Sequence, residues 1–324
     1  MTTPRGDLGL SDPTVEDPLV GGVAPAAPPG AAAPDVSLVG RRVRRPEFLH
    51  FALRNRKLAL GLVVVLGFLV LALVGPALTD YTPLSFDGLP GEAPSSTHWF
   101  GTTASGQDVF SQFVYGLRSS FVVGVVGGGI AAVVAMVVGF AAGYRGGVVD
   151  ELLSMLTNVV LVIPTIAVLI IVAAMRQGQG SFVLEGILIG LTSWPWAARA
   201  VRAQTFSLVA RDFVDVARLS GRPGRKIIAA EIAPNMSSYL LLMFILLFGN
   251  AILIGALLDF LGLGPANSVS LGLMMQNAVQ NAALLQGYWW WFVPPGVGII
   301  AVVGGLYVMN VGLDEVFNPK LRET

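Results

Sequence analysis

The residues best suited to charge-based recognition lie close together between Arg211 and Asn235. Small or apolar residues recur there at helical spacing, which predicts a short helix with one small apolar face. The residues of that face are Phe213, Val216, Ala217 and Ser220. Gly221 and Pro223 then predict a turn, because glycine reaches left-handed backbone angles freely and proline cannot continue a helix. Four cations surround the turn: Arg218, Arg222, Arg225 and Lys226. If the flanking segments span a membrane, this charge places the turn on the cytoplasmic side.

This passage resembles the EAA loop of bacterial ABC importer permeases. In that loop Glu-Ala-Ala is followed after three residues by Gly, and about ten residues later by Ile-Leu-Pro. The residues at those places are Asp215, Val216, Ala217, Gly221, Ile232, Ala233 and Pro234. Asp215, Val216 and Ala233 depart from the family's Glu, Ala and Leu, while the glycine and the spacing are kept. The resemblance implies that residues 204–237 hold a cytoplasmic coupling helix, including Phe213, that sits in a groove of an ATPase subunit. The alternative is a basic amphipathic loop lying on lipid headgroups.

Few residues could support catalysis or metal binding. The two histidines, His50 and His98, lie on opposite sides of the first apolar stretch, so they cannot share a metal ion or a catalytic role. The chain has no cysteine. It also lacks the Gly-x-x-x-x-Gly-Lys-Ser/Thr loop that would bind ATP. We therefore expect no enzymatic activity and no cofactor in this chain, with ATP and Mg²⁺ bound by partner subunits.

Hydrophobic residues make up 54% of the chain and charged residues 12%, which is typical of a polytopic membrane protein. Several apolar stretches are long enough to cross about 30 Å of hydrocarbon. They are residues 58–78, 121–143, 152–174, 182–201, 239–263 and 292–313. The sequence thus predicts an all-α integral membrane protein with six transmembrane helices, in a transmembrane domain over 58–324. Pro164 and Pro195 predict kinks in the third and fourth spans.

The placement of basic residues predicts the orientation of the spans. Of the 20 lysines and arginines, only Arg118 and Arg176 fall outside the N-terminal region, the loop at Arg145, the central loop and the C-terminal tail. Because cytoplasmic loops are rich in Lys and Arg, we expect both termini and the loop between spans four and five to be cytoplasmic. Residues 79–117 are then an extracytoplasmic loop. Trp289, Trp290 and Trp291 are expected to form an aromatic anchor at the outer interface.

The N-terminal region differs in composition from the rest of the chain. Residues 1–40 are rich in Pro, Ala and Gly and contain no apolar run, so we expect a disordered cytoplasmic tail. Residues 41–57 form a basic juxtamembrane segment suited to contact with membrane lipid. The direct junction of this segment with the first span argues against nucleic-acid binding.

A second motif, between His98 and Phe110, precedes the second span. It resembles the His-Pro-Phe-Gly-Thr-Asp-x-x-Gly-Arg-Asp-Val-Phe signature of the second permease subunit of oligopeptide, dipeptide, nickel and glutathione importers. The matching residues are His98, Phe100, Gly101, Thr102, Gly106, Asp108, Val109 and Phe110. Thr103 and Gln107 replace the signature's Asp and Arg, so any salt bridge made by those two residues is missing. The resemblance extends over about residues 48–324.

The two resemblances imply a non-catalytic subunit that forms half of a translocation pathway across the cytoplasmic membrane. They imply as partners a homologous second permease, two ABC ATPase subunits and an extracytoplasmic solute-binding protein. Short peptides are the implied substrate, with oligosaccharides, nickel chelates or glutathione as alternatives. An ion-coupled secondary transporter is a remote alternative, because such carriers place a carboxylate mid-membrane. The candidates here, Glu185 and Asp259, are expected nearer the outer ends of their spans.

Overall fold

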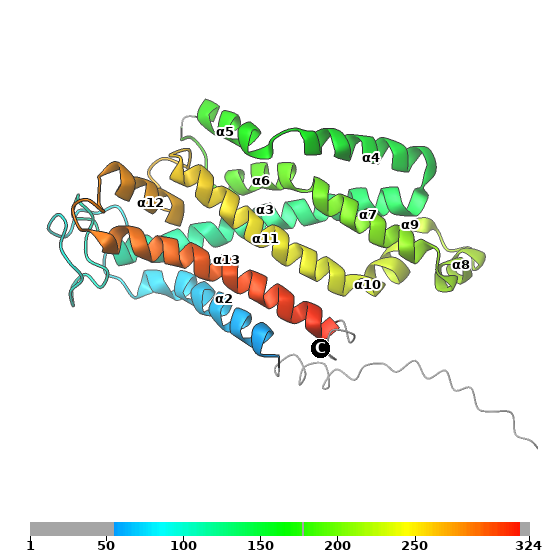
Figure 1. The fold of residues 1–324 in the computed structure, drawn as a ribbon, viewed down its shortest axis with the longest axis horizontal. Helices are drawn as coiled ribbons and strands as arrows, with labels where there is room; N and C mark the ends of the chain where they lie inside the picture. The colour runs from blue at the N-terminus through cyan, green and yellow to red at the C-terminus, as the bar shows by residue number, and fades with distance from the viewer. Residues whose placement is uncertain (1–54, 177, 318–324) are drawn as a thin grey trace, which may run out of the picture. The chain divides into compact units, whose positions relative to one another are not determined.

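The computed structural model describes residues 55–176 and 178–317, so the tail predicted at 1–40 lies outside the described residues. Within these ranges the chain is helical, and its β-type pairing is confined to one isolated bridge between Thr102 and Asp108. The longer helices are α2 (Arg56–Val74), α3 (Val109–Arg145), α4 (Gly147–Val162), α5 (Thr165–Arg176), α6 (Phe182–Ser193), α7 (Pro195–Val209), α11 (Ser237–Phe260), α12 (Leu271–Gln280) and α13 (Trp289–Phe317). The shorter ones are η1 (Gly75–Ala77), α8 (Asp212–Leu219), α9 (Gly224–Ile227), the π-helical turn η2 (Ile228–Ile232) and α10 (Ala233–Asn235) (Figure 1).

Four of the described helical segments are long and apolar enough to cross a membrane. They are α2 with η1, α3, α11 and α13. A fifth candidate is α4 with α5, which are bent by 70° relative to each other at the break before Thr165. Pro164 lies in this break, so the predicted kink is confirmed, and its physical reason is the missing N–H of proline. The all-helical membrane architecture is therefore present, with four or five candidate spans among the described residues.

The predicted fourth span, 182–201, is interrupted. α6 ends at Ser193, Trp194 lies between the helices, and Pro195 begins α7. The predicted break at Pro195 is thus confirmed, and proline occupies the first helical position, where its missing N–H costs little. α6 has only 12 residues and α7 only 15, so each is too short to cross the hydrocarbon core alone, and α7 also carries Arg199 and Arg202. Because of this interruption, the structure has four or five candidate spans among the described residues, fewer than the six predicted from the sequence.

Helix α3 is the central element of the described residues. It packs against α6, α7 and α11, while α2 packs against α13 (Figure 1). Glycines permit the close approach: a Cβ on Gly128 would lie 2.7 Å from the Cα of Phe248, and one on Gly139 would lie 2.6 Å from Val201. With 37 residues, α3 runs for about 55 Å, which exceeds the hydrocarbon thickness of a bilayer. It therefore connects the two ends of the helical bundle, and both predicted motifs contact it.

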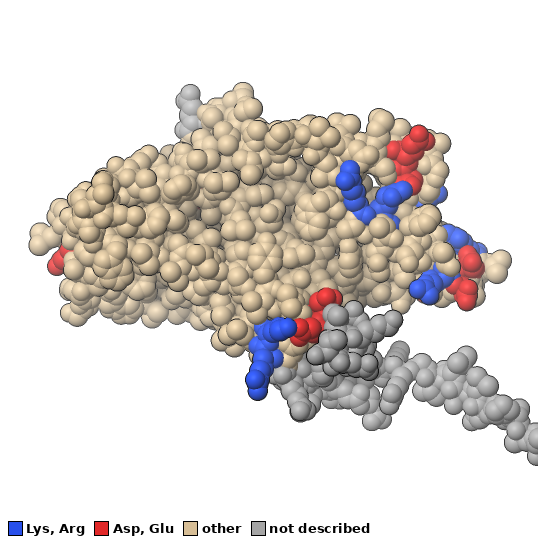
Figure 2. Space-filling view, in the orientation of Figure 1, with Lys and Arg blue, Asp and Glu red and all other residues tan. Residues whose placement is uncertain are grey.

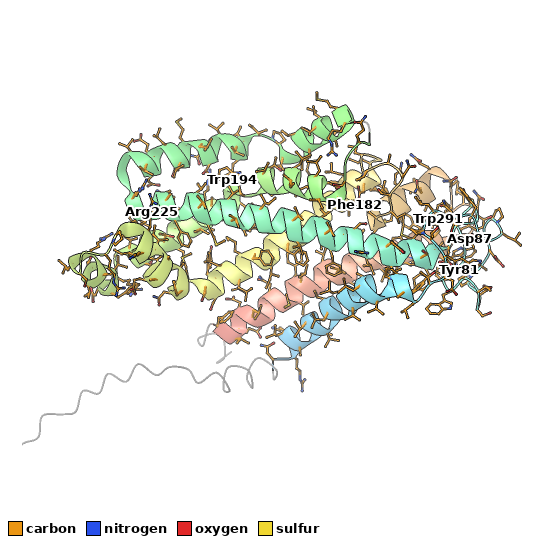
Figure 3. The ribbon with its side chains drawn as sticks, turned by 180° about the vertical axis from the view of Figure 1, so that it is seen from behind. Tyr81, Asp87, Phe182, Trp194, Arg225 and Trp291 are labelled. Carbon is orange, nitrogen blue, oxygen red and sulfur yellow. The ribbon has the colours of Figure 1, made fainter. Side chains whose placement is uncertain are left out.

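Charged side chains are unevenly distributed along the helices. In Figure 2 most of the visible Lys, Arg, Asp and Glu gather near α8, near α4 with α7, and where α2 begins and α13 ends. Figure 3 shows that Arg225 lies at one end of the helical bundle, whereas Tyr81, Asp87 and Trp291 lie at the other. The 211–235 loop and the 98–110 motif are therefore at opposite ends.

Candidate functional site

The predicted glycine turn of the 211–235 loop is formed. α8 ends at Leu219, and Gly221 follows with φ of 70°. The N–H of Gly221 donates to the carbonyl of Arg218, and the N–H of Arg222 donates to the carbonyl of Ala217, at 2.9 and 3.3 Å. This pair of bonds is a Schellman motif, which ends a helix with one residue in the left-handed conformation. The turn thus has the backbone that glycine favours, as the sequence predicts.

The second half of the loop returns to the membrane helices through a distorted helix. Pro223 precedes α9, and η2 contains a bond from the N–H of Ala233 to the carbonyl of Ile228, five residues earlier. Pro234 follows directly and has no N–H to continue the regular ladder. Arg222 in the turn pairs with Glu231 in η2 at 2.5 Å, which links the two halves of the loop.

The buried side of the loop belongs to a core shared with three long helices. Its buried residues are Val214, Ala217, Ile227 and Ile232. They join a hydrophobic cluster that also contains Ala135 of α3, Val201 of α7 and Leu247 of α11. The loop is therefore packed into the same core as these three helices. Pro234, the last residue of the predicted motif, is exposed.

The prediction of which residues form the buried face of α8 is partly wrong. Ala217 is buried and Phe213 is half-buried, as expected, but Val216 is 62% exposed and Ser220 is also exposed. Val214 occupies the core instead. One turn of α8 therefore presents its apolar Val216 and Leu219 outward, the latter 88% exposed. A sequence pattern of eight residues fits two neighbouring helix faces almost equally well, which explains the error.

The outward surface of the loop combines apolar side chains with charge. Asp215 pairs with Arg218 at 3.2 Å, and the Arg218 guanidinium lies 5.5 Å from the ring centre of Tyr144 at the end of α3. A Cβ placed on Gly221 would meet no atom of this chain within 4 Å. The loop is thus anchored on α3 on one side and leaves a small, partly apolar surface free on the other.

The second predicted motif forms a locked loop at the opposite end. His98 Nδ1 and Asp108 Oδ2 are 2.9 Å apart, and both side chains are buried. Asp108 also accepts a bond from the N–H of Ser111 and so caps the N-terminus of α3. Phe100 packs against Phe110 at 5.2 Å between ring centres. The structure brings the motif residues together, and their contacts hold the start of α3.

Thr102 and two glycines complete this loop. The Thr102 hydroxyl donates to the carbonyl of Leu89 and accepts from the N–H of Glu92, at 2.6 and 2.8 Å. Gly101 and Gly106 have φ of 70° and 81°, and a Cβ on Gly106 would lie 2.3 Å from the carbonyl oxygen of Gly88. Side chains at these two positions would push residues 101–106 away from the neighbouring backbone at Gly88 and Glu92.

Sequence reasoning missed the role of the tryptophans in this loop. The indole N–H of Trp290 donates to the carbonyl of Thr102 at 3.1 Å, and Trp291 is only 3% exposed. Only Trp289, at 56% exposure, is placed as an interfacial anchor would be. The Thr102 contact joins residues 188 positions apart, so no local pattern could have indicated it.

A comparison with protein families identifies the architecture. The family model described as "Binding-protein-dependent transport system inner membrane component" matches residues 135–323, which include α4 to α13 and the whole 211–235 loop. The chain belongs to this family. It is therefore a multi-pass permease of the cell membrane.

Relatives of this permease cover nearly its whole length. The dipeptide transport system permease protein DppC of Bacillus subtilis is 31% identical over 292 residues, which are 86% of this chain and 89% of the relative. The oligopeptide transport system permease protein OppC of Mycobacterium tuberculosis (strain H37Rv) is 30% identical over 86% of this chain and 96% of its own. OppC of Bacillus subtilis is 29% identical, with 92% and 97% covered.

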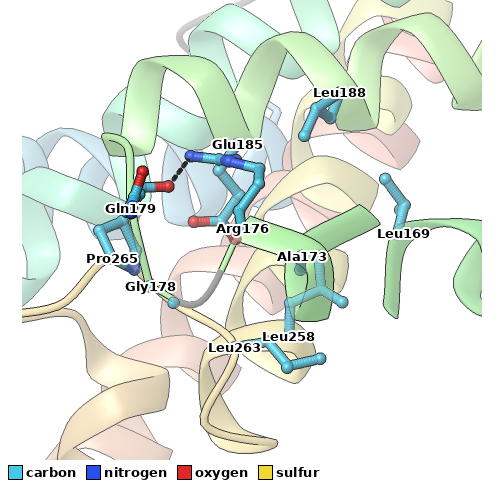
Figure 4. Close-up of a pocket in the computed structure, with 11 residues that line it drawn as sticks. Leu169, Ala173, Arg176, Gly178, Gln179, Glu185, Leu188, Leu258, Leu263 and Pro265 are labelled. Carbon is cyan, nitrogen blue, oxygen red and sulfur yellow. Dashed lines mark hydrogen bonds between the residues drawn. The ribbon is translucent and has the colours of Figure 1, made fainter. Parts of the chain in front are cut away.

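The permease also contains two buried carboxylates. Glu185 of α6 and Asp259 of α11 are 7% and 2% exposed. Neither oxygen of Glu185 has a hydrogen-bond partner, whereas Asp259 accepts a bond from the Ser270 hydroxyl with one oxygen and leaves the other unpartnered. Glu185 borders a cavity of about 20 Å³, room for about one water molecule. Arg176 borders the same cavity but donates to the carbonyl of Gln179 (Figure 4).

These carboxylates were expected near the outer ends of their helices, and they lie in the first turn of α6 and the last turn of α11. Their burial was not predicted. Among the described residues no group of three or more His, Cys, Asp or Glu side chains is arranged to hold a metal ion.

Proposed function

We propose that this permease is one subunit of an ATP-driven importer and carries short peptides into the cell through a pathway shared with a homologous second permease. The family description points to an extracytoplasmic solute-binding protein as a partner. Peptides are favoured as substrate because relatives over most of the chain are named for dipeptide or oligopeptide transport. Two partner ATPase subunits would bind ATP and Mg²⁺ and supply the energy.

The proposed topology has six spans with both termini in the cytoplasm. α6 and α7 together form the fourth span, because they follow each other across a single residue and cover Phe182–Val209, about 40 Å of helix. The concentration of charge near α8 and at the start of α2 supports a cytoplasmic position for that end. Residues 79–117 would lie outside and residues 204–237 inside, with 1–40 and 41–57 preceding a transmembrane domain at 58–324.

The observation that carries the proposal is the two-sided construction of the 211–235 loop. Its outer side presents Val216 and Leu219 next to a glycine turn surrounded by open space. Its inner side is packed into the core of α3, α7 and α11. A partner that grips the outer side can therefore move three long helices as a unit.

In the proposed cycle, closure of the ATP-bound ATPase subunits pushes this loop and tilts the helices from an outward-facing to an inward-facing arrangement. Asp215, Val216 and Gly221 form the contact surface. Ala217 and Ile232 hold the loop to the core, and Phe213 is half-buried between the two. Lipid headgroups are the alternative occupant of the same surface.

Ion-coupled transport is the competing function, since buried carboxylates are what such carriers use to bind ions. Glu185 and Asp259 are buried carboxylates of this kind. However, they lie at helix ends, and the family is one of binding-protein-dependent transport systems. An ATP-driven mechanism therefore remains the proposal.

The test uses the complete transporter in liposomes with its binding protein. We expect ATP hydrolysis and substrate uptake to rise when the binding protein is loaded with a short peptide. A thermal-shift screen of the binding protein against peptides and gluco-oligosaccharides separates the two substrate classes. Uptake that follows an ion gradient and needs no ATP would overturn the mechanism, and stabilisation by neither class would overturn both substrate assignments.

A further inference from the structure

A cavity of about 280 Å³ lies between the last two turns of α3, the middle of α4 and the first half of α7. Its polar lining comes from two helices: Ser154, Thr157 and Asn158 on α4, and Arg199 and Arg202 on α7. Figure 2 shows basic side chains beside a hollow in the region of α4 and α7. The cavity is large enough for a phosphate group with part of the molecule that carries it.

The two arginines of this cavity have unequal partners. Arg202 donates to both carboxylate oxygens of Asp150, so its charge is neutralised. Arg199 donates to the side-chain oxygen of Asn158 at 2.5 Å, and that partner is a neutral amide. The two arginines carry two positive charges, whereas the side chains that bond to them carry one negative charge in total. An anion entering the cavity would find one guanidinium whose charge is not matched.

Given the orientation proposed above, the cavity lies in the inner half of the bilayer. Arg202 and Arg199 precede the end of α7 at Val209 by seven and ten residues, about 10 and 15 Å along the helix. Leu153 and Asn158 follow the start of α4 at Gly147 by about 9 and 16 Å. Because long arginine side chains extend along apolar surface toward the membrane interface, their guanidinium groups can reach the phosphates of the inner leaflet from this depth.

Apolar residues accompany the polar lining of the cavity. Val138 and Leu153 line it, and Val137, Met155 and Leu156, which follow or precede lining residues in the chain, are 65%, 61% and 48% exposed. A free anion gains nothing from such neighbours, whereas an acyl chain attached to the anion can cover them. The combination of an unmatched guanidinium and an apolar margin fits a lipid better than a dissolved ion.

We propose that this cavity binds the phosphate of an anionic phospholipid from the inner leaflet, with Arg199 as its main contact. Arginine suits this task because its planar group can form two bonds to a phosphate. Basic pockets between transmembrane helices on the cytoplasmic side are known to take such headgroups. A bound lipid would brace α4 against α7, which leads directly into α8. The inference rests on the proposed membrane orientation, and it adds a lipid contact on the helix that precedes the 211–235 loop.

The experiment counts lipids on the complete transporter. The purified complex is stripped of lipid, incubated with vesicles of phosphatidylcholine alone or mixed with phosphatidylglycerol, and measured by native mass spectrometry. We expect the wild-type complex to retain phosphatidylglycerol selectively. Asn158→Asp, nearly the same size, gives Arg199 a carboxylate partner and should lower this retention about tenfold, as should Arg199→Gln.

The matched control is Lys57→Gln, which lowers the net charge by the same amount on the same predicted side. Lys57 pairs with Glu315 and does not line the cavity. The Lys57→Gln complex should therefore retain phosphatidylglycerol as the wild type does. Equal retention by Asn158→Asp and wild type would overturn the proposal. If inorganic phosphate displaces the lipid, the cavity is a site for a free anion and the lipid assignment is wrong. If a dipeptide displaces it, the cavity is part of the transport pathway and the lipid assignment is also wrong.

This readout is independent of transport. Lipid is counted on a purified complex, so a complex that hydrolyses ATP in response to peptide but binds no phosphatidylglycerol refutes the lipid site alone. A complex that binds lipid through Arg199 but does not respond to peptide refutes the proposed function alone.

Discussion

Substitution of Gly221 by valine tests the coupling role of the 211–235 loop most directly. Gly221 has φ of 70°, and a non-glycine residue in this region costs about 1–2 kcal/mol, more for a β-branched one. A Cβ there meets no atom of the chain within 4 Å, so no steric clash adds to that cost. This is a small part of the roughly 5–15 kcal/mol that stabilises a domain. The variant should therefore fold and insert into the membrane.

Docking of a partner is the property that we expect to be weakened. The side chain of valine would project into the open space that a fitted groove has to occupy. Overpacking of a close-packed contact costs about 1–3 kcal/mol, which corresponds to roughly 5- to 150-fold in the docking constant. Gly221→Ala adds only one methyl group and should fall between wild type and Gly221→Val.

The assay is co-purification of the ATPase subunits with the permease pair, together with ATP hydrolysis stimulated by liganded binding protein in liposomes. Gly287→Val is the matched control. Gly287 has φ of 83°, and its Cβ would also meet nothing within 4 Å, but it lies between α12 and α13. The control bears the same backbone strain and should dock normally. Full co-purification and stimulation by Gly221→Val would show that the loop is not the coupling element and would favour the lipid-surface interpretation.

Four further predictions address the remaining features. Asp215→Lys should weaken ATPase co-purification, because it breaks the pair with Arg218 and reverses the charge of the docking surface; unchanged binding would remove Asp215 from that surface. His98→Ala should lower thermal stability by about 1–3 kcal/mol, since the buried Asp108 loses a partner, and an unchanged melting temperature would contradict the structural role of that bond. Glu185→Gln should preserve ATP-driven uptake, because the carboxylate has no bond to lose; loss of uptake with normal assembly would favour ion coupling. Reporter fusions after Gln112, Gly178 and Gln280 should read outside, and fusions after Gly146, Pro223 and Thr324 inside; an outside signal at Pro223 would overturn the topology.

The sequence predicted those features that depend on local backbone chemistry. Pro164 and Pro195 interrupt helices, and Gly221 ends α8, because each residue acts on its own backbone within one turn. The membrane architecture was likewise predictable, since long apolar stretches are a property of composition. These predictions needed no knowledge of which elements contact one another.

Features that depend on packing were not predictable in the same way. The face of α8 that is buried is decided by contact with α3, α7 and α11, and the sequence of α8 fits more than one face. The bond between Trp290 and Thr102 and the burial of Glu185 beside α11 require the positions of distant helices. By contrast, the predicted fourth span is divided into α6 and α7 because Pro195 begins a new helix after Trp194, as its proline predicted.

The location of Arg199 and Arg202 links the 211–235 loop, the proposed coupling element, with the membrane around it. A cation within a membrane domain is costly unless it has a partner, and α7 carries two arginines within four residues, both lining the cavity between α3, α4 and α7. The structure offsets one with Asp150 and gives the other only a neutral partner. Since α7 runs directly into α8, whatever compensates Arg199 also helps to fix the base of the loop. The strength of coupling to the ATPase should therefore depend on the charge of the surrounding lipid as well as on the residues of the loop itself.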